Sequence, residues 1–139
     1  MKVFKSGADF AFENYGSAKV NYSEEFESIL KIIADKGSYI VWREKWLAYS
    51  PAKNKSGHLI LDENASVAAM RHELQHLIDD ESYGFPGLGW YMQYPAIYRQ
   101  LKFRGYLAEL SFAREKKDFD LARQIIENMR VRRFELLEY

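Results

Sequence analysis

Two histidines and a glutamate, His72, Glu73 and His76, constrain the fold of this chain more than any other feature of its sequence. Residues four apart lie one turn apart on the same face of an α-helix, so both imidazoles can reach one metal ion when the segment is helical. The large apolar residues around them recur every three or four positions: Val67, Met70, Leu74, Leu77 and Ile78. This spacing predicts an amphipathic helix over residues 62–80, with the polar residues 62–64 at its start.

The motif that these residues form, His-Glu-x-x-His, is typical of sites in which the two histidines bind zinc. Zinc held by three protein ligands keeps one position open for water and lowers the pKa of that water to about 7. Glu73 lies beside the two histidines on the predicted helix, where its carboxylate could take a proton from such a water. We therefore expect His72 and His76 to be zinc ligands and Glu73 to be a general base.

A third ligand is needed, and we expect it on a different helix. A histidine six positions after His76 would supply it, but that position is Ser82. Glu109 is the preferred candidate, because it lies in an otherwise apolar stretch and a buried lone carboxylate requires a partner. Gly105 and Ala113, one turn before and after it, give that helix a face that could approach another helix closely. Two further carboxylates remain as alternatives: Glu115 and Asp79.

Asp80 lies four residues after His76, on the same face of the predicted helix. Its carboxylate could accept the ring N–H of a ligand histidine or anchor a neighbouring loop. It could equally be a solvated residue at a helix end. The motif and Glu109 have plainer alternatives too: solvated histidines on a surface helix, and a solvated glutamate paired with a nearby Lys or Arg.

The rest of the sequence predicts a small α+β domain. We expect its short strands to form an antiparallel or mixed sheet. An N-terminal helix, the motif helix and two C-terminal helices would pack with this sheet. Residues 1–20 have no clear period and are expected to be mostly irregular. The further predicted elements, in chain order, are a helix from Asn21 or Ser23 to Gly37, two antiparallel strands at 39–42 and 46–49, a strand at 58–61, a glycine-rich loop at 81–94, a helix from Pro95 to about Lys117, and a last helix capped by Asp118 or Asp120. The loop could be a flexible rim over a cleft or a connection anchored by its aromatic residues.

The composition limits the class of protein. The chain has 139 residues and a mass of 16.4 kDa, which suits one domain over residues 1–139. Lys and Arg number 20, as do Asp and Glu, so no net field favours nucleic acid or an anionic membrane as a partner. The lack of cysteine excludes a disulfide scaffold and a thiol nucleophile. No apolar stretch suits a signal peptide or a membrane span, so we expect a cytoplasmic protein if the chain is complete.

These residues resemble the gluzincin group of zincin metallopeptidases, in which a glutamate from a later helix joins the His-Glu-x-x-His helix. The resemblance covers residues 58–80 well and residues 104–113 loosely. By size the chain is most similar to the single-domain minigluzincins and to the metallopeptidase domains of bacterial polymorphic toxins. The resemblance implies a zincin-like fold in which residues 58–61 form an edge strand that lines the cleft and pairs with substrate. The chain departs from the thermolysin-type pattern in the longer spacing to Glu109 and in having Ala113 where an aspartate could be expected.

The resemblance further implies a zinc-dependent peptidase that acts on a peptide or protein substrate. His72, His76 and Glu109 would be the Zn²⁺ ligands, and Glu73 would be the catalytic base. Many relatives stabilise the oxyanion with a His or Tyr, and Tyr106 is the geometric candidate here. Other tyrosines are alternatives for that role, with packing as the plainer explanation for each: Tyr83, Tyr91 and Tyr94.

Other classes of function remain open. The chain could be a non-catalytic binding or regulatory module on a zincin-like scaffold, or a helical interaction domain in which the motif is accidental. It could also be one domain of a larger secreted bacterial protein. An active peptidase inside a cell would need restraint, and residues 1–20 or the last helix could provide it by covering the cleft.

Overall fold

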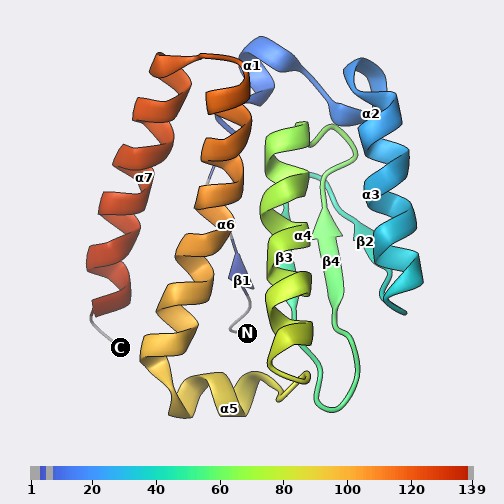
Figure 1. Cartoon of the computed structure of the whole chain (residues 1–139), viewed down its shortest axis with the longest axis vertical. Helices are drawn as coiled ribbons and strands as arrows, with labels where there is room; N and C mark the ends of the chain where they lie inside the picture. Colours follow the sequence, from blue (N-terminus) through green and yellow to red (C-terminus); the bar gives the residue numbers. More distant parts are fainter. Residues whose placement is uncertain (1–3, 6–7, 138–139) are drawn as a thin grey trace.

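The computed structural model describes residues 4–5 and 8–137 of the chain (Figure 1). They form an α+β fold, as predicted, in which α4 lies across one face of a small mixed sheet. The described elements, in chain order, are β1 (Phe4–Lys5), α1 (Phe12–Tyr15), α2 (Ala18–Asn21), α3 (Ser23–Asp35), β2 (Ile40–Trp42), β3 (Leu47–Ser50), β4 (His58–Leu61), α4 (Val67–Ser82), α5 (Leu88–Gln93), α6 (Pro95–Glu115) and α7 (Phe119–Leu137).

The sheet has the strand order β1-β3-β4-β2, which places β4 in its interior. β4 pairs with β3 in antiparallel orientation and with β2 in parallel orientation. The strands predicted at 39–42 and 46–49 are therefore present, but they do not pair with each other, because β4 lies between them. The expectation that residues 58–61 form an edge strand is wrong, since both sides of β4 are hydrogen-bonded within the sheet.

Helix α4 begins at Val67 rather than at residue 62. Its N-cap is Ser66, whose hydroxyl accepts a hydrogen bond from the backbone N–H of Ala69 at 3.1 Å. Asp62 instead stabilises the preceding turn, because its carboxylate accepts a hydrogen bond from the backbone N–H of Asn64 at 2.8 Å. Aspartate and asparagine favour turns as well as helix starts, so the sequence pattern alone misplaced this boundary.

Short helices lie where the sequence predicts irregular structure or a loop. Helices α1 and α2 occupy part of the N-terminal segment, and Ser17 caps α2 by accepting a hydrogen bond from the N–H of Val20 at 3.3 Å. Helix α5 lies within the predicted loop and follows Gly87, which has a φ of 90°. Each of these helices is too short to show a clear apolar period in the sequence.

The remaining helices lie where the sequence predicts them. Helix α3 begins at Ser23 and ends before Gly37, whose φ of 74° suits a residue after a helix. Its N-cap is Tyr22, without a side-chain cap, so the expectation of Asn21 or Ser23 as N-cap is wrong. Helix α6 begins at Pro95, as expected for a proline in a first turn. Asp118 caps α7, because its carboxylate accepts a hydrogen bond from the N–H of Leu121 at 2.9 Å. This confirms the first of the two caps predicted for that helix.

The main core lies where α4 packs against the sheet and against α6. Its fully buried side chains include Tyr49, Leu59, Leu61, Met70, Leu77 and Phe112. Ile78, one of the apolar positions of the predicted motif helix, is instead 39% exposed. Within the part of the chain that the structure describes, none of the helices has the length and apolarity needed to cross a membrane.

Candidate functional site

The four predicted site residues lie together between α4 and α6, which run side by side in opposite directions (Figure 1). Helix α4 contributes His72, Glu73 and His76, and α6 contributes Glu109. All four side chains are buried, with exposed fractions of 1%, 0%, 2% and 4% in that order. Burial of this many polar groups is costly unless they interact with one another or with a ligand.

His72 connects the two helices directly. Its Nδ1 lies 2.7 Å from Oε2 of Glu109, which is hydrogen-bond distance. Its ring lies edge-to-face against the ring of His76, with centroids 4.9 Å apart and an interplanar angle of 75°. Its Nε2 lies 4.0 Å from Oε1 of Glu73. The imidazole of His72 is thus flanked by a carboxylate from each helix.

Gly105 allows α6 to come this close to the two histidines. A Cβ at this position would lie 2.5 Å from Nε2 of His72 and 2.9 Å from Cε1 of His76, closer than side chains pack in proteins. Glycine in a helix interior is less favourable than alanine by roughly 0.5–1 kcal/mol. The close contact between the α6 backbone and both imidazoles gives a physical reason for glycine at this position.

Burial and neighbouring charges act differently on the two histidines. Burial disfavours the charged form of His72, but the carboxylates of Glu73 and Glu109 outweigh burial and raise its pKa. Burial lowers the pKa of His76 well below its usual value, and nearby His72 and Lys102 lower it further. His76 is therefore held neutral, which is the form of histidine that binds a metal.

The charge of Glu109 is also affected by its surroundings. Burial raises the pKa of its carboxyl, the contact with His72 opposes this rise, and the carboxylate of Asp9 adds to it. Glu109 therefore takes up a proton more readily than a solvated glutamate does.

The side chains suit zinc by their chemistry, since two histidines and a carboxylate are a common zinc ligand set. Among residues 4–5 and 8–137, however, no three His, Asp or Glu side chains are placed to hold one metal ion together. The carboxylate of Glu109 is engaged by Nδ1 of His72. This hydrogen bond uses Nδ1 of His72 and Oε2 of Glu109, so binding of one metal ion while it persists would use Nε2 and Oε1. The close approach of the two helices at Gly105 already brings the ligands near one another.

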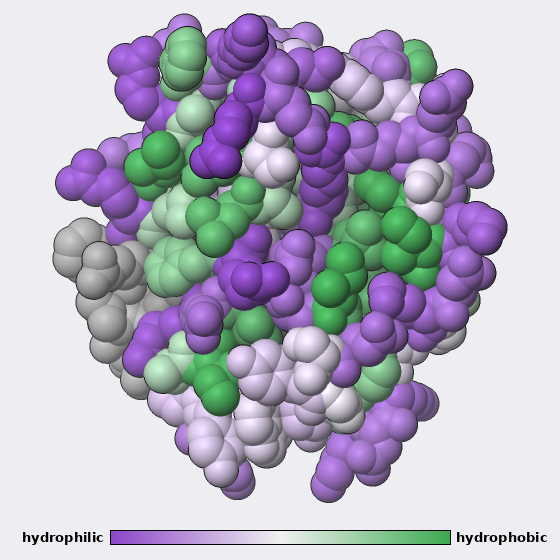
Figure 2. All heavy atoms as spheres, viewed as in Figure 1, coloured by the Kyte–Doolittle hydropathy of each residue, from purple (hydrophilic) through white to green (hydrophobic). Residues whose placement is uncertain are grey.

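The two alternative third ligands are engaged elsewhere. Glu115 lies 3.0 Å from Nη2 of Arg71. Asp79 accepts hydrogen bonds from Arg104 at 2.8 Å and from Gln75 at 3.0 Å. Both arginines line a groove of about 380 Å³ on the other side of α4 and α6, and its apolar lining consists of Leu74, Ile78, Leu107 and Ala108. Figure 2 shows the face over α4 and α6, with apolar side chains in patches between polar ones.

Asp80 anchors the C-terminal part of α4 to the sheet and to α5. Its carboxylate accepts hydrogen bonds from the hydroxyl of Tyr49 in β3 and from the hydroxyl of Tyr91 in α5, the latter at 2.5 Å. The Tyr49 oxygen also accepts a hydrogen bond from the backbone N–H of Gly57 at 3.1 Å. Burial raises the pKa of Asp80, although both hydroxyls oppose this effect. Of the roles predicted for Asp80, the structure shows the anchoring one.

Tyr106 is the candidate oxyanion donor that lies beside the motif. Its ring is edge-to-face against His72, with centroids 4.7 Å apart and an interplanar angle of 87°. Tyr83 and Tyr94 instead pack against Trp90, with centroid distances of 5.7 Å and 4.6 Å. These two tyrosines fit the packing explanation.

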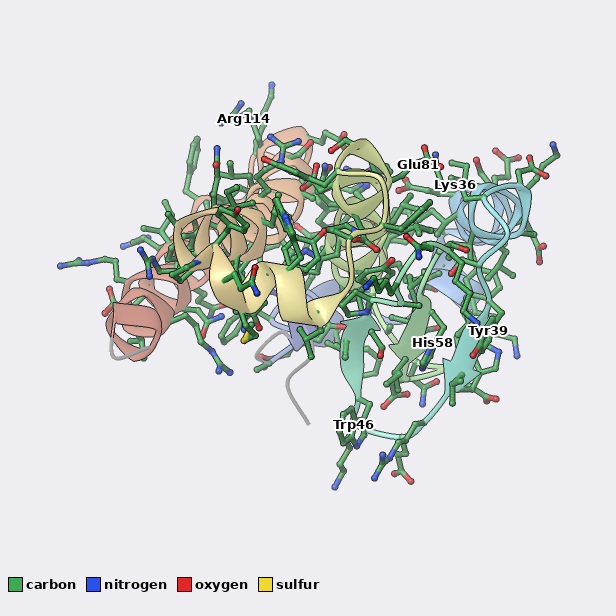
Figure 3. The ribbon with its side chains drawn as sticks, turned by 90° about the horizontal axis from the view of Figure 1, so that it is seen from below. Lys36, Tyr39, Trp46, His58, Glu81 and Arg114 are labelled. Atoms are coloured by element: carbon green, nitrogen blue, oxygen red, sulfur yellow. The ribbon has the colours of Figure 1, made fainter. Side chains whose placement is uncertain are left out.

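The third histidine of the chain lies apart from the other two. His58 is in β4 and stacks on Tyr39, with ring centroids 5.0 Å apart and nearly parallel planes (Figure 3). It is half-buried on the sheet. His58 is therefore useful as a reference for experiments on His72 and His76.

Sequence reasoning found only some of the side chains that act on the site. Lys102, which lowers the pKa of His76, lies one turn before Tyr106 and two turns before Glu109, and the sequence already made it a possible ion partner of Glu109. Tyr49 and Asp9 reach the site region through contacts with residues far away in the sequence. No local pattern shows such contacts.

Comparison of the chain with known protein families, with curated proteins and with solved structures finds no match. A fold class alone does not define a function. The functional assignment therefore depends on the chemistry of the site itself.

Proposed function

We propose that this chain is a zinc-dependent peptidase, with His72, His76 and Glu109 as metal ligands and Glu73 as general base. The observation that carries the proposal is the convergence of these four side chains from two helices onto one buried cluster. A solvated surface helix would give no reason for this burial. The glycine at position 105, which fits the α6 backbone against both imidazoles, supports the same conclusion.

Each residue has a defined task in this proposal. Bound zinc would polarise a peptide carbonyl and acidify a water molecule. His76 is neutral through burial and can bind metal without losing a proton. His72 and Glu109 would bind the metal through Nε2 and Oε1, the atoms that lie outside their mutual hydrogen bond. The carboxylate of Glu73 would take up a proton and later deliver it to the leaving amine.

Metal content tests the site itself. Wild type, His76→Ala and His58→Ala are prepared side by side with added zinc and analysed by elemental mass spectrometry. We expect near-stoichiometric zinc in wild type and in His58→Ala, because His58 lies on the sheet, and loss of zinc in His76→Ala. Wild type that takes up no zinc would refute the metal site.

The identity of the third ligand is tested by a matched pair of variants. Glu109→Gln is expected to weaken zinc binding at least about tenfold, or roughly 1.4 kcal/mol, in a titration against a competing chelator. Glu115→Gln should bind zinc as wild type does, because Glu115 is paired with Arg71. The reverse result would reassign the ligand to Glu115.

The general base is tested by Glu73→Gln, which keeps the size and polarity of the side chain. This variant is expected to retain zinc but to lose hydrolysis of a peptide library by a factor on the order of 10²–10⁴. Turnover that persists at the wild-type rate would end the assignment of Glu73.

One observation favours a second candidate, a non-catalytic binding or regulatory module on the same scaffold. The four residues are at most 4% exposed, and His72 and Glu109 already interact with each other. For such a module, His72→Asn and Glu109→Gln would lower the free energy of unfolding, and added zinc would leave it unchanged. Stabilisation of wild type by zinc would decide against this candidate.

A further inference from the structure

Strand β1 lies against the structure that supports the site but has no task in the proposed reaction. It pairs with β3 in antiparallel orientation, with Phe4 opposite Tyr49 and Lys5 opposite Ala48. It forms the edge of the sheet on the side of α6 (Figure 1). Tyr49, the partner of Phe4, donates a hydrogen bond to Asp80 in the C-terminal part of α4. β1 is thus connected through β3 to one end of the site-bearing helix.

Asp9 holds the other end of the same helix. Its Oδ2 accepts a hydrogen bond from the backbone N–H of Ser66 at 2.7 Å, and its Oδ1 accepts one from the Ser66 hydroxyl at 2.6 Å. Ser66 is the N-cap of α4, where a negative charge is favourable. Ala11 follows closely and is buried in the main core.

We call β1, Asp9 and Ala11 the N-terminal clasp. The clasp holds α4 at Ser66 and, through β3, at Asp80. The motif lies between these two points, and its two histidines and Glu73 are at most 2% exposed. A peptide from solution has no access to side chains that are buried to this extent.

We propose that the N-terminal clasp is an internal inhibitor, and that its displacement opens the site to an extended polypeptide. β1 uses the backbone groups on the outer edge of β3, which are the groups that an added strand would need. Among the described residues, β1 and β3 pair at two positions, and releasing this local pairing costs less than unfolding the domain. This inference rests on the proposed function, because it concerns access to the same site.

Chemical access to the histidines tests the clasp without any catalysis. Zinc-free protein is treated with diethyl pyrocarbonate, and the modification of each histidine is followed by peptide mass spectrometry. Phe4→Pro/Lys5→Pro removes both backbone donors of β1, one of which faces β3, whereas Phe4→Ala/Lys5→Ala keeps both donors. We expect His72 and His76 to react about tenfold faster in the proline variant than in the alanine control, through more frequent local opening. His58, which lies outside the clasp, should react equally in both.

A reversible disulfide between β1 and β3 tests the opposite change, in which the clasp is prevented from leaving. The chain has no cysteine, so Lys5→Cys/Ala48→Cys introduces one pair of thiols. Directly opposed residues of antiparallel strands lie about 4.5 or 5.5 Å apart at Cα, which a disulfide can span. Oxidation should slow both the labelling of His72 and His76 and the hydrolysis of peptides, and reduction with a phosphine should restore both. The two single-cysteine variants should not respond.

The outcomes separate the clasp from the peptidase. Equal labelling in the proline and alanine variants, or thiols that fail to pair on oxidation, would overturn the clasp. Labelling that follows the clasp, with no hydrolysis in any sample, would support the clasp and refute the peptidase. Hydrolysis that is equally fast in the locked and reduced forms would support the peptidase and refute the clasp.

Discussion

Gly105 and Asp80 both position the helix that carries the motif, by different physical means. Gly105 acts through the lack of a side chain, since a Cβ would overlap both imidazoles. Asp80 acts through two hydrogen bonds, from Tyr49 and Tyr91, that tie α4 to β3 and α5. Substitutions at these two points should therefore affect the protein in different ways.

Gly105→Ala is expected to lower both the stability and the zinc affinity, although alanine is the better helix former. The added methyl group would overlap His72 and His76, and such overpacking typically costs about 1–3 kcal/mol in the free energy of unfolding. Gly89→Ala is the matched control, because nothing lies within 4 Å of a Cβ at that position. Urea unfolding and zinc titration measure both effects. A Gly105→Ala protein as stable as wild type would contradict the close packing described for α6.

Tyr91→Phe is expected to raise the pKa of Asp80 further, because the Tyr91 hydroxyl favours the charged carboxylate. Burial already raises this pKa above its value in the unfolded chain, so the folded state binds the proton more tightly. The stability that this proton contributes is therefore complete below the ordinary pKa of 3.8 and is lost as pH rises through the folded pKa. In Tyr91→Phe the folded pKa of Asp80 is higher, so the loss of stability with rising pH should continue to a higher pH.

Urea unfolding from acid to neutral pH measures this shift. Tyr94→Phe is the control, since Tyr94 is 48% exposed and packs on Trp90. The same pH profile in wild type and Tyr91→Phe would show that the Tyr91 hydroxyl does not act on Asp80.

At the scale of elements, the sequence predicted the long helices much better than the sheet. Helices carry local signals, such as Pro95 at the start of α6 and Asp118 at the start of α7. Strand pairing depends on contacts between distant residues, and nothing in residues 39–49 shows that β4 lies between β2 and β3. The sequence therefore predicted that the strands at 39–42 and 46–49 pair with each other. This prediction is wrong, because both pair with β4.

The same difference applies to the candidate site. The two histidines and Glu73 were predictable, because one helix sets their spacing. Glu109 could be proposed from the apolar stretch around it and from Gly105, and the structure brings it to His72. Asp9 could not be predicted, because its contact with Ser66 joins two segments far apart in the chain.

Ser66→Ala is expected to destabilise α4 as an element. The hydroxyl of Ser66 accepts a hydrogen bond from Ala69 and donates one to Asp9, so its loss should cost about 1–2 kcal/mol in the free energy of unfolding. Ser28→Ala, at an exposed position within α3, should have little effect. Equal urea midpoints for the two variants would show that the cap of α4 contributes nothing.

At the scale of the whole molecule, ion pairs between helices hold the scaffold around the site. Arg71 of α4 contacts Glu25 of α3 at 2.6 Å and Glu115 of α6 at 3.0 Å. Lys36, just after α3, contacts Glu81 of α4 at 2.7 Å (Figure 3). These contacts join α3, α4 and α6 into one unit. The N-terminal clasp takes no part in these ion pairs and contacts the scaffold at Ser66 and along β3.

Zinc is expected to stabilise the whole domain, since a ligand that binds only the folded state shifts the unfolding equilibrium. At a free zinc concentration one hundred times the dissociation constant, the gain is about 2.7 kcal/mol. Thermal unfolding with and without zinc measures this gain. His76→Ala and added magnesium are the controls, and neither should show it. A chelator should return wild type to the stability of the metal-free protein.

Strand β3 becomes the edge of the sheet whenever β1 leaves it. Residues Leu47–Ser50 would then present unpaired backbone groups to solvent. Two of these residues, Ala48 and Tyr49, are completely buried while β1 is in place. An unpaired edge of this kind can recruit strands from other molecules and start aggregation. Variants with a weakened β1 should therefore precipitate more readily as their sites become more accessible, so that a more active preparation would also have the shorter storage life.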